Sequence, residues 1–137
     1  MPVTTPPRRP VENWEARRDE WIADVTRIVD DVEAWASEQD WLVHRHPKTL
    51  TDDSIGSYEV PMLMIRTPNA PLVLDPLARD VVGASGRIDL SVLQSLDNIL
   101  IIKNEAGWHL VVDPPNLDRP WSKEGFLELA AGLAKRA

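Results

Sequence analysis

The first third of the chain has the hydrophobic pattern of one long helix. Large apolar residues recur at intervals of seven, at Trp14, Trp21, Ile28 and Trp35. Smaller apolar residues fill the positions between them, at Ile22, Val25, Val29, Val32 and Ala36. Apolar residues that recur every three or four positions lie on one face of an α-helix. Residues 12–40 are therefore predicted to be helical, with Asn13 as the N-cap.

The other positions of this segment are polar and are expected to face solvent. They are Glu15, Arg18, Asp19, Asp24, Arg27, Asp31 and Glu38. The apolar stripe is predicted to cover a sheet. A wide aromatic stripe can also mark an interface, so a homodimer seam is the alternative.

After Trp41 the apolar residues alternate with a period of two, which indicates strands. Turn residues divide this region into segments at 42–51, 58–65, 72–74, 87–92, 99–103 and 108–112. Gly107 stands in a hairpin loop where a positive φ is expected. Because the connections are short, neighbouring strands are predicted to pair antiparallel, as a meander of about six strands.

The chain ends in a second, shorter helical pattern. Ser122 is the predicted N-cap, and Trp121 before it can pack onto Phe126 as a hydrophobic staple. The inner stripe of this helix is Phe126, Leu129, Ala130 and Leu133. A long helix, a meander and a short helix predict an α+β fold with both helices packed on an antiparallel sheet.

The length and composition narrow the range of proteins further. The chain has 137 residues and no cysteine, which excludes disulfides, thiol catalysis and cysteine zinc sites. Residues 1–11 are proline-rich and predicted to be a flexible tail, and residues 12–137 are predicted to be one domain. No apolar run is long enough to span a membrane, and the start lacks the apolar core of a secretory signal. A cytoplasmic location is the expectation.

The charge is −7, from 22 acidic and 15 basic residues. Nucleic-acid binding depends on lysine and arginine neutralising phosphates, so an acidic chain without a dense basic run is not expected to bind nucleic acid. A basic protein partner suits the sign of the charge better.

The one paired-glycine element, Gly83-Ala84-Ser85-Gly86, is followed by Arg87. It lacks the third glycine of a dinucleotide fingerprint and the lysine of a phosphate-binding loop, and a strand pattern follows it. A nuclease reading of Asp89 and Lys103 lacks a second carboxylate. The element is predicted to be a turn, and Gly83, Gly86 and Arg87 are a candidate anion site because turn N–H groups can hold an anion.

The three histidines are the candidate metal ligands. His44 and His46 are two residues apart and share one face of a strand, and His109 would have to supply the third ligand from another strand. No cofactor is predicted.

Tryptophan is in excess, with six residues against one tyrosine and one phenylalanine. Trp41, Trp108 and Trp121 stand at the ends of elements and are the candidate partner-binding residues. The favoured hypothesis is a non-enzymatic protein-binding module, such as an inhibitor, an immunity or antitoxin-like protein, or an accessory subunit. One alternative is a small enzyme or metal-binding domain that uses the histidines. Another is a ligand-binding domain with a pocket between helix and sheet, lined by Met62, Met64 and the tryptophans.

Overall fold

The structure is a computed structural model that describes residues 9–52, 56–79, 85–93, 98–112 and 117–136; for residues 9–14 it describes the backbone alone. Its elements follow one another in the order α1 (Arg9–Glu38), β1 (Leu42–Asp52), β2 (Gly56–Arg66), β3 (Pro71–Ala78), β4 (Gly86–Val92), β5 (Asn98–Asn104), β6 (Gly107–Val112), β7 (Leu117–Pro120) and α2 (Lys123–Arg136). All the described strands form one antiparallel sheet in chain order. The predicted α+β meander is confirmed, with seven strands rather than about six.

Helix α1 begins at Arg9, three residues earlier than predicted, so Asn13 lies inside it and the predicted N-cap is wrong. Pro10 falls in the first turn, where the missing N–H of proline removes no helical hydrogen bond. The helix ends because Asp40 adopts a φ of 62°, and Trp41 N then donates to the oxygen of Ala36 at 3.0 Å.

The predicted apolar stripe of α1 is confirmed from Trp21 to Ala36, while the side chain of Trp14 lies outside the described residues. Its buried side chains are Trp21, Val25, Ile28, Val29, Val32 and Ala36. They pack against alternate residues of the sheet, of which the fully buried ones are Leu63, Ile65, Leu72, Leu74, Ile88, Leu90, Ile99, Ile101 and Leu110. The register places these residues on one face, called the covered face below.

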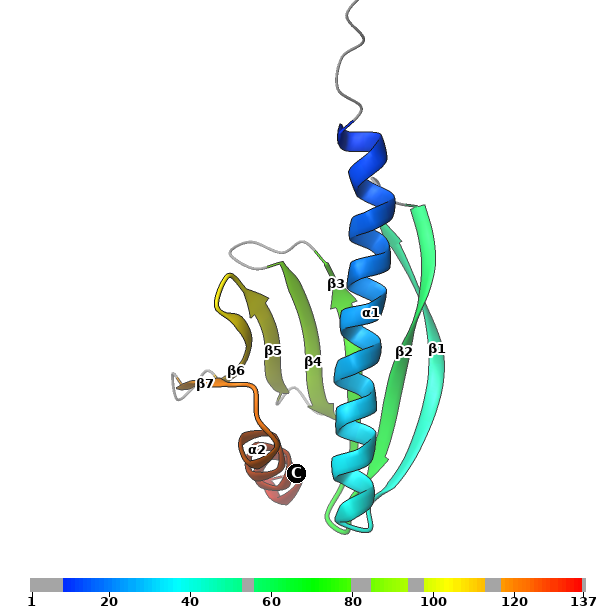
Figure 1. Ribbon diagram of the computed structural model, residues 1–137. Helices are drawn as coiled ribbons and strands as arrows, with labels where there is room; N and C mark the ends of the chain where they lie inside the picture. Colours follow the sequence, from blue (N-terminus) through cyan, green and yellow to red (C-terminus); the bar gives the residue numbers. More distant parts are fainter. Residues whose placement is uncertain (1–8, 53–55, 80–84, 94–97, 113–116, 137) are drawn as a thin grey trace, which may run out of the picture.

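Both helices pack on the covered face. A Cβ built on Gly86 of β4 would lie 2.6 Å from the Trp21 ring of α1. A Cβ built on Gly125 of α2 would lie 3.2 Å from Cδ1 of Leu110 on β6. Figure 1 shows α1 running lengthwise beside β1 and β2, with α2 near its C-terminal end.

The long ribbon of β1 and β2 turns over along its length. The buried positions of β2 are Tyr58 and Val60 in one half but Leu63 and Ile65 in the other, so the buried set changes face between them. The pairing of β1 with β2 runs without a bulge, so the change comes from rotation of the whole ribbon. Figure 1 shows the two strands crossing.

Two prolines face each other where the ribbon turns over, because Pro47 is the register partner of Pro61. Neither can donate a ladder hydrogen bond, so this pair must be one whose backbone groups point away from each other. Pro61 therefore presents no N–H toward β3. The pairing of β2 with β3 accordingly starts two residues later, at Leu63 with Leu74.

Helix α2 begins as the sequence predicts. Gly125 N donates to Oγ of Ser122 at 3.0 Å, which is the N-cap hydrogen bond. The rings of Trp121 and Phe126 lie 5.6 Å apart, so the staple forms.

Two strand boundaries differ from the sequence prediction. Strand β3 continues past Asp75 and Pro76 to Ala78, because the register shifts between Pro76 and Ala78 and a bulge tolerates proline. Strand β7 was not predicted, since its four residues include an aspartate, an arginine and a proline and show no apolar alternation. Its pairing with β6 holds it in the sheet.

Candidate functional site

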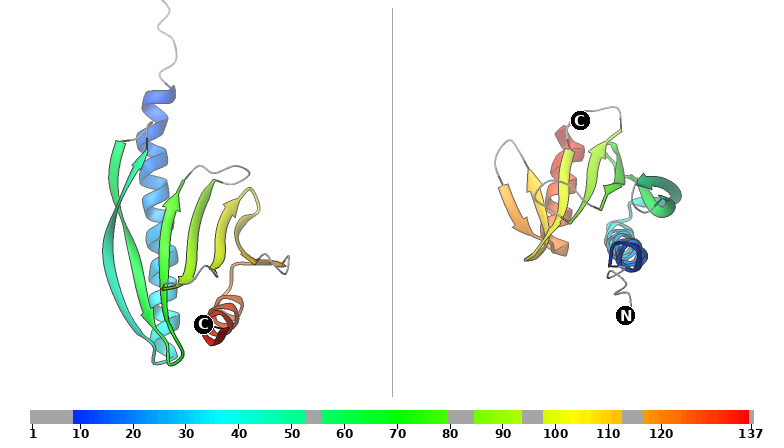
Figure 2. Two further views of the ribbon diagram at one scale, coloured as in Figure 1. Left: turned by 180° about the vertical axis from the view of Figure 1, so that it is seen from behind. Right: turned by 90° about the horizontal axis from the view of Figure 1, so that it is seen from above.

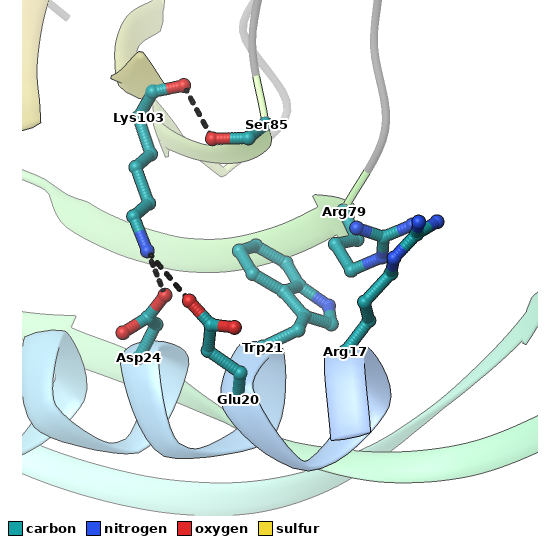
Figure 3. Close-up of a pocket in the computed structure, with 7 residues that line it drawn as sticks. All are labelled: Arg17, Glu20, Trp21, Asp24, Arg79, Ser85 and Lys103. Carbon is teal, nitrogen blue, oxygen red and sulfur yellow. Dashed lines mark hydrogen bonds and ion pairs between the residues drawn. The ribbon is translucent and has the colours of Figure 1, made fainter. Parts of the chain in front are cut away.

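A small pocket lies between the first half of α1 and the neighbouring ends of β3, β4 and β5. Its cavity volume is about 70 Å³. It is lined by Arg17, Glu20, Trp21, Asp24, Arg79, Ser85 and Lys103, all drawn in Figure 3. The volume suits a group of a few heavy atoms, and the lining is mostly polar and charged.

One end of the pocket is held by an ion pair between α1 and β5. Lys103 lies two residues after Ile101 and therefore points to the covered face. Its Nζ lies 2.5 Å from Oδ2 of Asp24 and 3.6 Å from Oε1 of Glu20. The Asp24 side chain is 13% exposed, so the prediction that Asp24 belongs to the solvated face of the helix is wrong.

The other end of the pocket gathers hydrogen-bond donors. Trp21 is 1% exposed, and its Nε1 has no hydrogen-bond partner among the described residues. Figure 3 shows the indole nitrogen on the side of the ring that faces the guanidinium groups of Arg17 and Arg79. The ring is fixed in place because it packs on Gly86 and stacks with Trp108 at a centroid distance of 6.3 Å.

The sequence did not single out this pocket. Lys103 was considered only as a nuclease residue, and Arg17 and Arg79 belong to no motif. One signal was present, because Lys103 continues the buried alternation of Ile99 and Ile101 and so places a charge toward the helix.

Of the predicted anion-site residues, only Gly86 and Arg87 are described, and they face opposite sides of the sheet. Gly83 lies outside the described residues. Gly86 lies under the Trp21 ring, and Arg87 points to the opposite face, where its Nε donates to Oδ1 of Asp89 at 2.8 Å. This hydrogen bond raises the pKa of Arg87, against an opposing effect of burial.

The three histidines lie on two distant strands. His44 and His46 on β1 are adjacent, with ring centroids 4.4 Å apart. His109 is on β6, which four strands separate from β1, and its Nδ1 lies 2.9 Å from Oδ1 of Asp118. Over the described part of the chain, no three histidine, aspartate or glutamate side chains are close enough to hold a metal ion.

The three candidate tryptophans are partly buried and pack against the core. Trp108 stacks on Trp21, and Trp121 lies 5.3 Å from the ring of Trp35. Trp41 closes the end of α1. Nε1 of Trp121 is buried and has no hydrogen-bond partner among the described residues.

The second face of the sheet is named the open face, because no described helix packs on it. Seen from behind, β3, β4 and β5 have no helix of the described chain across them (Figure 2). Its partly exposed residues are Met62, Met64, Val73, Asp75, Arg87, Asp89, Ser91, Leu100, Ile102, His109 and Val111. The apolar residues form two groups, one on β2 and β3 and one on β5 and β6, and ion pairs lie between the two groups.

A wider groove of about 500 Å³ lies at the corner of β1, β2 and β3. It is lined by Leu42, Val43, His44, His46, Met64, Ile65, Arg66 and Pro71. Met64 points to the open face, so this groove is not the predicted pocket between helix and sheet. Leu42 at its rim is 69% exposed.

Among the described helices, none has a stretch both long and apolar enough to cross a membrane. Comparisons with protein-family models, with curated proteins and with solved structures find no match to this chain.

Proposed function

We propose that this protein is a non-enzymatic protein-binding module, that its docking surface is the open face of the sheet, and that a second copy of the chain occupies it. The observation that carries the proposal is the apolar surface left on β5 and β6. Leu100, Ile102 and Val111 are all partly exposed there, and Leu100 pairs in register with Val111. Large apolar side chains grouped on an unpartnered sheet face are typical of a protein interface.

The charges of the open face suit burial against another chain. Lys48 Nζ lies 2.5 Å from Oδ1 of Asp75, and Arg87 is hydrogen-bonded to Asp89. These two ion pairs neutralise the centre of the face internally. A partner that covers them therefore does not have to supply a compensating charge, which lowers the desolvation penalty of docking.

The charge distribution favours a second copy. The segment Arg9–Glu38 has nine acidic and four basic residues, which accounts for −5 of the total charge of −7. This excess lies on the helix side of the sheet, away from the open face. Two acidic chains repel each other least when they meet through a nearly neutral surface, and the open face is such a surface.

Sedimentation equilibrium at increasing protein concentration tests the proposal. The wild-type chain is expected to dimerise with a dissociation constant on the order of micromolar, as a modest apolar interface gives. Ile102→Glu places a charge among the apolar residues of the open face and is expected to leave a folded monomer.

The matched control is Ala23→Glu, which adds the same charge at an exposed position of α1. It is expected to dimerise within about threefold of wild type, because long-range repulsion is screened at physiological salt. A wild-type chain that stays monomeric to about 1 mM, or an Ile102→Glu variant that still dimerises, contradicts the proposal.

A further inference from the structure

We infer that the pocket beneath α1 binds a small carboxylate anion, held by the Trp21 indole N–H together with the guanidinium groups of Arg17 and Arg79. The pocket is on the covered face and the proposed docking surface is on the open face. The two proposals can therefore fail separately.

The indole nitrogen is the first reason. An N–H group that is buried without an acceptor loses its hydrogen bond to water and gains nothing in return. Trp21 is 1% exposed, and its Nε1 has no acceptor among the described residues. The nitrogen faces the arginine end of the pocket, so a ligand oxygen there would restore the missing hydrogen bond (Figure 3).

The arginines are the second reason. Arg17 and Arg79 come from different elements, α1 and the end of β3, and line the same pocket with Trp21. Each guanidinium offers several N–H donors in a fixed plane, which matches the two oxygens of a carboxylate.

The size of the pocket limits the class of anion. The volume of about 70 Å³ holds only a small headgroup, which favours a planar carboxylate over the bulkier phosphate. At the opposite end, Asp24 and Glu20 bring two carboxylates against the single charge of Lys103. That end repels an anion and confines it to the arginine end of the pocket.

Nuclear magnetic resonance of the indole N–H groups tests the inference at the proposed atom. The chain has six tryptophans, and the Trp21 signal is assigned as the one that disappears in Trp21→Phe. Sodium acetate is the probe, at pH 7 and constant ionic strength. The Trp21 signal is expected to shift downfield and to saturate in the millimolar range, as for a weak ligand of four heavy atoms.

Acetamide is the control, because it has nearly the shape of acetate without its charge. At equal concentration it is expected to shift the Trp21 signal at least tenfold less. The reason is that charge-assisted hydrogen bonds are about twice as strong as neutral ones. Inorganic phosphate is expected to bind at least threefold more weakly than acetate. An unmoved Trp21 signal at 50 mM acetate overturns the inference, and tighter binding of phosphate overturns the choice of a carboxylate.

Arg17→Ala and Arg27→Ala form a matched pair, since both remove one arginine from an exposed position of α1. Only Arg17 lines the pocket. Arg17→Ala is expected to weaken acetate about tenfold, and Arg27→Ala less than twofold. Equal weakening by both variants would show general charge attraction and overturn the site. Circular dichroism confirms that each variant is folded.

Discussion

The two faces of the sheet are built from alternate residues of the same strands, yet they differ in composition. The covered face is apolar across β2 to β6, with Lys103 as a charged exception at its margin. On the open face, two ion pairs separate two groups of apolar residues. The comparison indicates that stability comes mainly from the covered face, while the open face is the surface proposed above for contact with another chain.

A matched pair of leucine variants, one on each face, tests this difference between the faces with the largest expected effect. Leu90 on β4 is 0% exposed on the covered face, and Leu100 on β5 is partly exposed on the open face. Leu90→Ala is expected to lower the free energy of unfolding by about 3 kcal/mol, because it removes buried methyl groups and leaves a cavity. Leu100→Ala is expected to lower it by about 1 kcal/mol.

Urea unfolding at a low protein concentration measures both variants in the monomer. Equal losses would mean that the open face is as closely packed as the covered face, against the proposed docking surface. A loss below about 1 kcal/mol for Leu90→Ala would contradict the placement of the core.

The contact of α1 with β4 gives the next largest effect. Gly86→Ala would place a Cβ 2.6 Å from Cζ3 of Trp21, so either the ring or the strand must move. The free energy of unfolding is expected to fall by about 2 kcal/mol, measured by urea unfolding.

Gly132→Ala on α2 is the control glycine. A Cβ there meets nothing nearer than Nη1 of Arg136 at 3.5 Å, and alanine favours a helix over glycine. It is expected to raise the free energy of unfolding by up to about 1 kcal/mol. Similar changes in both glycine variants would contradict the close approach at Gly86.

Removing the charge of Lys103 from the covered face is expected to lower the free energy of unfolding by a smaller amount. Lys103→Met leaves the Asp24 carboxylate, 13% exposed, without its cation. Because the Lys103 side chain is 26% exposed, water offsets much of the loss. A decrease of about 1.5 kcal/mol is expected, below the 3–5 kcal/mol of a fully buried pair.

Asp24→Asn in the Lys103→Met background removes the unpaired charge. Thermal unfolding is expected to show recovery of more than half of the lost stability. If the double variant is no more stable than Lys103→Met, the buried carboxylate is not the cause.

The smallest effect is expected at the surface. Arg45 of β1 donates to Oδ1 of Asp30 at 2.7 Å and also contacts Glu33, and its side chain is 36% exposed. Arg45→Ala is expected to cost less than about 0.5 kcal/mol, because exposed ion pairs contribute little.

The hydrogen bond with Asp30 is the largest cause that raises the pKa of Arg45. A raised pKa means that the stabilisation is fully present below the pKa of unfolded arginine and lost only above it. Arg45 therefore does not titrate between pH 6 and pH 9. The loss of unfolding free energy in Arg45→Ala, measured by urea unfolding, is expected to be the same across this range. A difference larger than about 1 kcal/mol between Arg45→Ala and wild type would contradict this exposed geometry.

The helices and most strands could be predicted because their signals are local. The seven-residue recurrence from Trp21 to Trp35 is a property of one segment, and Ser122 caps a helix that starts at the next residue. The positive φ of Gly107, 110°, was likewise predicted from its loop. By contrast, β7 forms only through pairing with β6, and one leucine followed by two charged residues and a proline does not indicate that pairing.

The candidate site could not be predicted because it is made by distant segments. Lys103 and Asp24 are 79 positions apart, and Arg17 and Arg79 meet only because α1 lies across the sheet. Asp24 was predicted to be exposed because it is polar. The sequence does not show which flank of a helix meets a lysine, so its burial could not be predicted. The rotation of the β1 and β2 ribbon was also missed, because the alternation of residues around Pro61 is compatible with either face.

The proline at the middle of β1 has a consequence for aggregation. Strand β1 is the outermost strand, and eleven residues of exposed edge could template the addition of a foreign strand. The missing N–H of Pro47 points to this edge, since its partner Pro61 takes the opposite side. An incoming strand would meet a gap in its hydrogen bonds near the centre, so the chain is protected against edge-to-edge fibril growth where it is otherwise most vulnerable.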